Sequence, residues 1–247
     1  MTAQTNLNGK TIFFDLDGTL LEMHTEEFVQ NYLKELAKYV GDRMDAKQLI
    51  GLLWEATKAM IQSDEPEMTN EEVFVRYFLT HSGLEKDAIW PVFEAFYSEI
   101  FPTLSHLTNP SPWGKKIVEA AKEQGFRVAV TTNPVFPKEA IYSRLGWLGL
   151  TPDEFELVTV YEEAHYTKPN LGYYQEVCDK LGVKPEDCIM VGNHMQEDMV
   201  AGELGLKTFL VTNYMENRGE PLYRVDQQGT FEDVYNAIVN RTGVFAP

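Results

Sequence analysis

The chain has 247 residues, of which 44% are hydrophobic and 24% are charged, and its formal net charge is −17. This length suffices for one large domain, or for one domain that carries a smaller insert, and the composition is that of an ordinary globular protein. A strongly negative charge without basic runs argues against nucleic acid or an anionic membrane as a partner, because phosphate binding relies on clustered lysine and arginine.

The sequence carries no pattern typical of secretion or membrane insertion. Its first ten residues lack the apolar stretch of a secretory signal, and its apolar runs are far shorter than the roughly 20 residues of a membrane helix. Cys178 and Cys188 do not make a disulfide framework, and both fit a reduced compartment as small core residues. We therefore expect a cytoplasmic protein that contacts no membrane.

Short apolar runs predict the strands of a parallel sheet. They are rich in β-branched and aromatic residues and apolar on both phases, as strands covered on both faces should be. The runs are residues 11–16, 126–131, 155–160, 187–191 and 206–211. Helix-like segments separate them, and this alternation predicts an α/β fold with a Rossmann-like, doubly wound sheet.

The helices between these strands have recognisable ends. The Ser-Pro pair at 111–112 is typical of a helix start, and the helix that it opens should end near Gly125. Asn170 is a candidate N-cap for a helix that runs to residue 180 and ends at Gly182. Residues 195–204 predict a further helix.

Residues 24–107 interrupt the alternation with helical patterns and no convincing strand. Apolar spacing and capping signals, including a capping box at Thr69 and Glu72, predict helices over about 28–39, 45–61 and 69–83, with a fourth inside 85–101 begun by Pro91. We therefore divide the chain into a core, residues 1–22 and 108–247, and a helical insert, residues 23–107.

Two aspartates stand at the end of the first predicted strand, in the stretch TIFFDLDGTL. Asp15 and Asp17 are two residues apart in extended backbone, so both carboxylates can point to one place. Two like charges this close are costly unless a metal ion or a proton separates them, and Gly18 permits a tight turn after them. Because ligands of open α/β sheets bind beyond the carboxyl ends of the strands, this pair is a candidate site.

Polar groups also follow the second predicted strand. Thr131, Thr132 and Asn133 offer hydroxyl and amide groups for phosphate oxygens, although the same residues could serve only as turn formers. Lys168 precedes a helix and either brings a cation to this edge of the sheet or is a surface lysine.

The loop after the fourth predicted strand reads VGNHMQED, residues 191–198. Its acidic pair, Glu197 and Asp198, either belongs to the site or only compensates a helix dipole. These polar groups follow successive parallel strands. Their common placement is a more specific signal for a functional site than any one group alone.

The chain carries four motifs in this order: DLDGTL, a threonine that ends a strand, Lys-Pro at 168–169 and a glycine-containing loop with a later aspartate. This order resembles the haloacid dehalogenase (HAD) superfamily. The helical insert is similar to the type 1 cap of that superfamily, so the resemblance covers nearly the whole chain. It implies a Mg²⁺-dependent phosphatase that hydrolyses a small phosphorylated metabolite, a phosphomonoester, through an aspartyl-phosphate intermediate.

The resemblance also implies a role for each motif residue. Asp15 would be the nucleophile, and Asp17 the general acid and then the general base. Thr132, or Thr131 if the register differs by one, would hold a phosphoryl oxygen. Lys168 would neutralise the charge of Asp15 and of the phosphate.

Mg²⁺ would be held by Asp15, by the backbone carbonyl of Asp17 and by a carboxylate of the fourth motif. Asn193 stands where the family usually has an aspartate, and its amide oxygen can bind Mg²⁺ but lacks the charge. Asp198 is then the expected carboxylate, directly or through water, with Glu197 as a second possibility. We expect Mg²⁺ to bind more weakly than is usual in the family.

Gly18, Asn133 and His24 complete the expected site as substrate-binding residues. His24 and Glu22 lie in the hinge that leads into the insert. Either residue could face the substrate, or both could be hinge residues without contact to it. His194 is a poor Mg²⁺ ligand and is interpreted as a loop residue.

Three alternatives to a phosphatase remain at this stage. The dehalogenases of this fold lack the second aspartate, so Asp17 argues against that activity. A phosphomutase shares all four motifs. A non-enzymatic scaffold is favoured by Asn193, whereas the agreement of Asp15, Thr132 and Lys168 with the motifs favours an enzyme.

Overall fold

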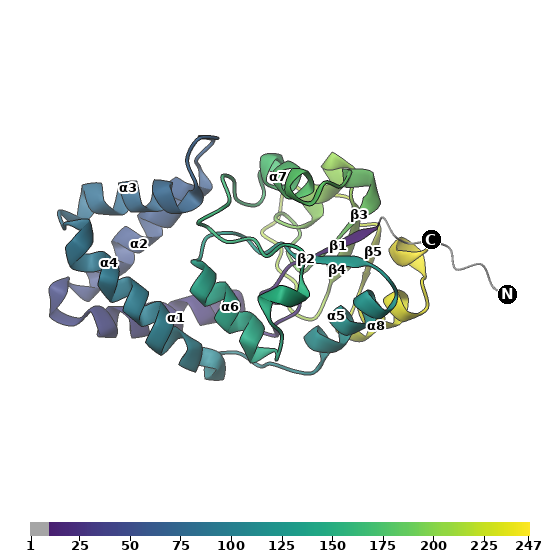
Figure 1. The fold of residues 1–247 in the computed structure, drawn as a ribbon, viewed down its shortest axis with the longest axis horizontal. Helices are drawn as coiled ribbons and strands as arrows, with labels where there is room; N and C mark the ends of the chain where they lie inside the picture. Colours follow the sequence, from purple (N-terminus) through teal and green to yellow (C-terminus); the bar gives the residue numbers. More distant parts are fainter. Residues whose placement is uncertain (1–9) are drawn as a thin grey trace.

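The computed structural model describes residues 10–247, and within this range it forms a five-stranded parallel sheet in the order β2-β1-β3-β4-β5 (Figure 1). The strands are β1 Thr11–Phe14, β2 Arg127–Val130, β3 Cys188–Gly192, β4 Lys207–Val211 and β5 Gln227–Gly229. The predicted Rossmann-like core is thereby confirmed. The expectation that residues 1–10 carry no secretory signal concerns positions that, except for Lys10, lie outside the described range.

The central strand β1 explains the apolar runs of the sequence. Ile12, Phe13 and Phe14 are all fully buried, because helices cover both faces of the sheet. Ile12 and Phe14 belong to one apolar cluster and Phe13 to another, as the alternation of side chains along a strand requires. The core therefore lies in two layers, one on each side of β1.

Two details of the predicted sheet were wrong. Residues 155–160 form no regular strand, although they run beside β2 with a bridge between Val158 and Val130. Three backbone hydrogen bonds join them to β2: Glu156 N to Val128 O at 2.9 Å, Val130 N to Leu157 O at 2.8 Å and Thr159 N to Val130 O at 3.0 Å. Strand β5 was missed, because its sequence Gln-Gln-Gly has no apolar run and lies at the partly exposed edge of the sheet.

Helices cover both faces of the sheet. They are α5 Trp113–Glu123, α6 Lys138–Trp147, α7 Leu171–Leu181 and α8 Phe231–Val239. The predicted start of α5 is confirmed, and α7 has the predicted caps, since the Asn170 side chain accepts from the Gly172 nitrogen and Gly182 is left-handed. The helix expected at 195–204 is reduced to a 3-10 helix, η6 Met199–Leu204, because residues 195–198 form turns around the site.

The helical insert lies at the left end of the molecule in Figure 1, away from the C-terminus. Its elements are α1 Thr25–Val40, α2 Ala46–Ile61, α3 Asn70–Ser82, α4 Lys86–Ala95, the π-helical η2 Phe96–Ile100 and the 3-10 helix η3 Phe101–Leu107. The expected helices and the capping box are confirmed, but the start at Pro91 was wrong. Pro91 lies inside α4, where its missing N–H removes only one intrahelical bond.

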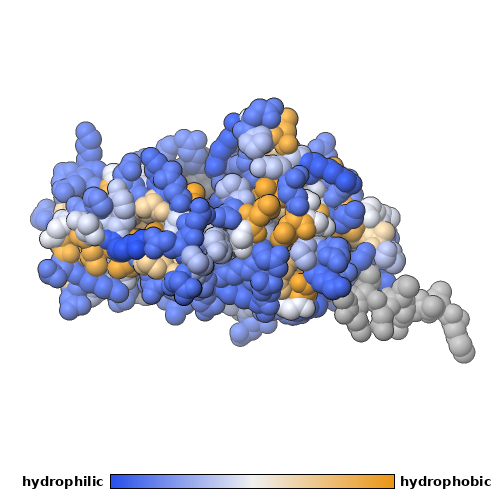
Figure 2. Space-filling model, turned by 90° about the horizontal axis from the view of Figure 1, so that it is seen from above, coloured by the Kyte–Doolittle hydropathy of each residue, from blue (hydrophilic) through white to orange (hydrophobic). Residues whose placement is uncertain are grey.

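The face of the molecule in Figure 2 is mainly hydrophilic, and hydrophobic residues appear on it in small groups. Both cysteines are buried and free, as expected. Within residues 10–247, no helix is both long enough and apolar enough to cross a membrane.

The capping box of α3 gives a test of the insert. Thr69 accepts from the Glu72 nitrogen at 3.2 Å, and the Glu72 carboxylate accepts from the Thr69 nitrogen at 2.9 Å. Thr69→Ala should lower the free energy of unfolding of the insert by about 1 kcal/mol, measured by urea denaturation. Thr80→Ala, at an exposed site in the last turn of the same helix, should change it by much less. Equal effects of the two substitutions would contradict the capping argument.

Candidate active site

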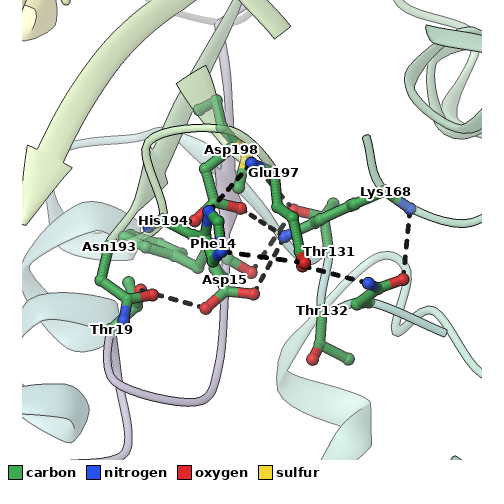
Figure 3. A network of polar contacts seen from close by, with 12 residues as sticks. Phe14, Asp15, Thr19, Thr131, Thr132, Lys168, Asn193, His194, Glu197 and Asp198 are labelled. Atoms are coloured by element: carbon green, nitrogen blue, oxygen red, sulfur yellow. Dashed lines mark hydrogen bonds and ion pairs between the residues drawn. The ribbon is translucent and has the colours of Figure 1, made fainter. Parts of the chain in front are cut away.

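An ammonium group buried between two carboxylates marks the carboxyl edge of the sheet (Figure 3). Lys168 donates from Nζ to Asp15 Oδ1 at 2.9 Å and to Asp198 Oδ1 at 2.6 Å. The Lys168 side chain is only 1% exposed, so this residue is not a surface lysine. Asp15 follows β1, and its backbone nitrogen donates to the Val191 carbonyl of β3 at 2.9 Å, which places the loops after these neighbouring strands together.

A second set of contacts joins Asp15 to the loop after β3. The Thr19 hydroxyl lies 3.1 Å from both Asp15 Oδ2 and Asn193 Oδ1, so these two oxygens converge (Figure 3). Asn193 is fixed from its other side, because Nδ2 donates to the Tyr214 carbonyl at 2.7 Å. Gly18 is required here, since its φ is +81° and a Cβ would collide with the Asn193 amide.

Asp198 is held by the backbone as well as by Lys168. Its Oδ2 accepts from the His194 nitrogen at 2.9 Å, and a Cβ on Gly192 would collide with this carboxylate. His194 has a buried Nε2 without a hydrogen-bond partner among residues 10–247. Burial lowers the pKa of His194, so the neutral ring is favoured at this position.

Asp17 has its own buried cation, which the sequence analysis missed. Arg144 of α6 is fully buried and donates from Nη1 to Asp17 Oδ2, while its guanidinium lies 4.4 Å from the centre of the Phe136 ring. Asp17 Oδ1 is buried and has no hydrogen-bond partner among the described residues. No helix was predicted over this segment. The available signal was the helical spacing of Arg144 from Ala140 and Ile141, with which it shares the buried face of α6.

These contacts shift the acid–base properties of the site. Burial raises the pKa of Asp15 and of Asp198, although Lys168 opposes the rise in both. Burial also raises the pKa of Asp17 to about 6, against the opposing effect of Arg144. Burial acts against the charged Lys168, but Asp15 and Asp198 outweigh it and raise its pKa well above the ordinary value. The ammonium therefore stays charged.

The residues after β2 face different ways. Thr131 is fully buried, and its hydroxyl lies 3.4 Å from the Phe14 carbonyl, within the sheet. Thr132 lines a cavity with Asp15, and its own carbonyl accepts from the Tyr173 hydroxyl at 2.9 Å. Asn133 lines the same cavity and accepts from the Lys168 nitrogen at 3.2 Å.

This cavity, which we call the acidic cavity, has a volume of about 510 Å³ and lies between the sheet edge and the insert. From the core it is lined by Asp15, Asp17, Thr132, Asn133, Asn193, His194, Glu197 and Asp198, and from the insert by residues that include Val29, Trp54 and Thr57. His24 and Gly18 do not line it. His24 lies in a neighbouring hollow, with its ring 4.9 Å from that of Tyr214, and the Glu22 carboxylate accepts from the Ser111 hydroxyl.

The oxygens at this edge suit a hard divalent cation. Asp15, Asn193, Asp198 and the backbone carbonyl of Asp17 could together hold Mg²⁺, which prefers oxygen ligands. Asp15 Oδ2 and Asn193 Oδ1 each lie 3.1 Å from the Thr19 hydroxyl, so two of these candidate ligand oxygens face the same place. Across residues 10–247, however, no three His, Cys, Asp or Glu side chains group as a metal site, so the amide of Asn193 would supply a neutral ligand.

Comparison with known proteins shows which family the chain belongs to. Residues 10–205 match the family model described as haloacid dehalogenase-like hydrolase. The chain is 25% identical to the pyrophosphatase PpaX of Halalkalibacterium halodurans, over 81% of this chain and 82% of the relative. It is 26% identical to the phosphoglycolate phosphatase of Nitrosospira multiformis, over 92% of this chain and 93% of the relative.

The fold is shared with solved structures. The crystal structure of a HAD phosphatase from Thermococcus onnurineus superposes with a TM-score of 0.59 and 19% identity, over 93% of this chain and 97% of that chain. At this identity the similarity concerns the fold alone. Together with the match of the family model over most of the chain, it leads to one conclusion: the protein is a hydrolase of the haloacid dehalogenase-like family.

Proposed function

We propose that the protein is a Mg²⁺-dependent phosphatase that hydrolyses a small phosphomonoester at the acidic cavity. The observation that carries this proposal is the buried Lys168 between Asp15 and Asp198, at the edge of a cavity that Asp17 and Thr132 also line. The names of relatives that are phosphatases support the reaction class.

The first step transfers the phosphoryl group to the protein. An oxygen of Asp15 attacks phosphorus, and the bond from phosphorus to the leaving oxygen breaks. Asp17 in its protonated form gives its proton to that oxygen, so the product leaves as an alcohol. A pKa of about 6 keeps part of Asp17 protonated near neutral pH. Thr132 donates to a phosphoryl oxygen. Burial raises the pKa of Asp15 as well, to about 6, and Lys168 opposes this rise and so favours the ionised form that attacks.

The second step releases phosphate. The carboxylate of Asp17 takes a proton from a water molecule, whose oxygen attacks phosphorus and breaks the bond to Asp15. Asp17 ends protonated, ready for the next cycle. Arg144 does not line the acidic cavity and is proposed to act through Asp17, because its guanidinium holds Oδ2 and leaves Oδ1 without a protein partner within residues 10–247. Arg144 is therefore a positioning residue.

Charge balance is the reason for including a metal ion. With Asp17 protonated for the first step, the two negative charges of Asp15 and Asp198 balance the two positive charges of Lys168 and Arg144. No net positive charge is then left to attract a dianionic phosphate. When bound, Mg²⁺ would supply that positive charge and would polarise the phosphoryl oxygens. Both oxygens of Asp198 already have donors, which favours contact through water.

Hydrolysis of p-nitrophenyl phosphate tests the function. We expect turnover with Mg²⁺, loss of turnover in EDTA, and recovery when Mg²⁺ is added back. Asp15→Asn should lower kcat by roughly 10⁴-fold or more, because the nucleophile is lost. If the folded protein hydrolyses no phosphoester with Mg²⁺ or another divalent cation, the proposal is wrong and a non-enzymatic role takes its place.

The role of Arg144 is tested by a pair of substitutions. Arg144→Gln should lower kcat by about 100-fold with little change in KM, because Asp17 loses its fixed orientation. Arg144→Lys keeps the charge and should recover part of the loss. A purely structural role predicts instead that both variants lose thermal stability and retain kcat in their folded fraction.

Asn193 sets the expected strength of metal binding. Asn193→Asp adds a charged ligand and should tighten Mg²⁺ binding by about tenfold, measured by calorimetry and by the Mg²⁺ dependence of the rate. Asn236→Asp, at an exposed position of α8, adds the same charge elsewhere and is the control. Equal changes in the two variants would show that net charge, not ligation at Asn193, controls metal affinity.

A further inference from the structure

A second cavity of about 390 Å³, which we call the aromatic cavity, adjoins the acidic cavity. The two share the lining residues Val29, Trp54, Thr57, Val135 and Phe136, so the two cavities are neighbours. Each volume lies within the roughly 300–1,000 Å³ of small-molecule sites. The aromatic cavity is therefore an adjacent space for a group attached to a phosphate at Asp15.

The walls of the aromatic cavity are largely apolar side chains of the insert and the loop before α6. The aromatic residues among them are Tyr32, Trp54, Phe74, Trp90, Phe93, Tyr97, Phe136 and Tyr161. The hydroxyls of Tyr32 and Tyr97 lie 3.0 Å apart, so one of them donates to the other within the protein. Trp54 is 51% exposed although it stands at the junction of the two cavities, where an apolar ligand would cover it.

The charges of the aromatic cavity disfavour a second anion. Among the described residues that line it are four glutamates, Glu71, Glu94, Glu139 and Glu162, and one lysine, Lys138. The N-terminus of α6, which could attract an anion, is already occupied, because Glu162 accepts from the Lys138 nitrogen at 3.0 and 3.2 Å. In the acidic cavity, Arg218 is paired with Glu197 at 2.9 Å.

We infer that the leaving group of the substrate is an apolar alcohol, alkyl or aryl, without a second anionic group, that binds in the aromatic cavity against Trp54. This inference rests on the proposed phosphatase function and narrows its substrate class. The inferred substrate differs from pyrophosphate and phosphoglycolate, the compounds in the names of two relatives, because each of these compounds carries a second anionic group. Such a group would meet glutamates here.

A series of n-alkyl phosphates tests the inference at nearly constant leaving-group chemistry. We expect kcat/KM with Mg²⁺ to rise from ethyl through butyl to hexyl phosphate, by at most about fourfold per methylene for full burial. Hexyl phosphate should exceed phosphoglycolate and pyrophosphate. If kcat/KM does not change with chain length, or if phosphoglycolate or pyrophosphate is preferred, the inference is overturned and the phosphatase proposal stays intact.

Variants of Trp54 locate the effect. Trp54→Ala should lower the ratio of kcat/KM for hexyl over ethyl phosphate by at least about threefold, whereas Trp54→Phe should retain most of it. Tyr142→Ala, another exposed aromatic residue, which belongs to neither cavity lining, should leave the ratio unchanged. An unchanged ratio in folded Trp54→Ala contradicts the assignment.

Binding gives a readout that does not depend on turnover. Calorimetry with ethyl- and hexylphosphonate should show tighter binding of the longer chain and a loss of this difference in Trp54→Ala. If no phosphoester is hydrolysed but the difference is present, the phosphatase proposal fails while the apolar site stands. If the two phosphonates bind equally, the apolar site is wrong whatever the activity.

Discussion

The structure depends on the burial of one ammonium group between two carboxylates. Removing three charges from water is expensive, and their mutual attraction offsets the cost only when the geometry is close. Lys168 meets this condition with contacts of 2.9 and 2.6 Å to Asp15 and Asp198. The same requirement fixes the loops after β1 and β3 against each other, since loss of any one partner would leave an uncompensated buried charge.

Two buried cations stand beside the two neighbouring aspartates. Arg144 pairs with Asp17, and Lys168 pairs with Asp15, so two aspartates that are close in sequence have different electrostatic partners. Burial nevertheless raises the pKa of both carboxyl groups to about 6. The pKa values therefore do not distinguish the two aspartates, whereas their contacts do.

The insert supplies most of the aromatic cavity. The candidate catalytic groups lie at the sheet edge, whereas the walls of this cavity come mainly from α1 to α4. Relatives of about 25% identity have names that refer to different phosphate compounds, and fold alone does not fix a substrate. An apolar, glutamate-rimmed space beside the candidate catalytic groups is a property of this chain's own side chains, from which a substrate class can be inferred.

The sequence by itself determined the parallel core, the helical insert and the motif residues at the strand ends, because apolar periodicity and the order of short motifs are local patterns. It did not predict β5, whose Gln-Gln-Gly stretch has no strand pattern, and it assigned a strand to 155–160, where only irregular edge pairing forms. Arg144, 127 residues from Asp17 in the chain, became part of the site only through the packing of α6. The aromatic cavity likewise exists only once the insert lies against the core. Periodicity shows which face of a helix is apolar, but tertiary structure alone decides whether that face is filled by protein or left open to a ligand.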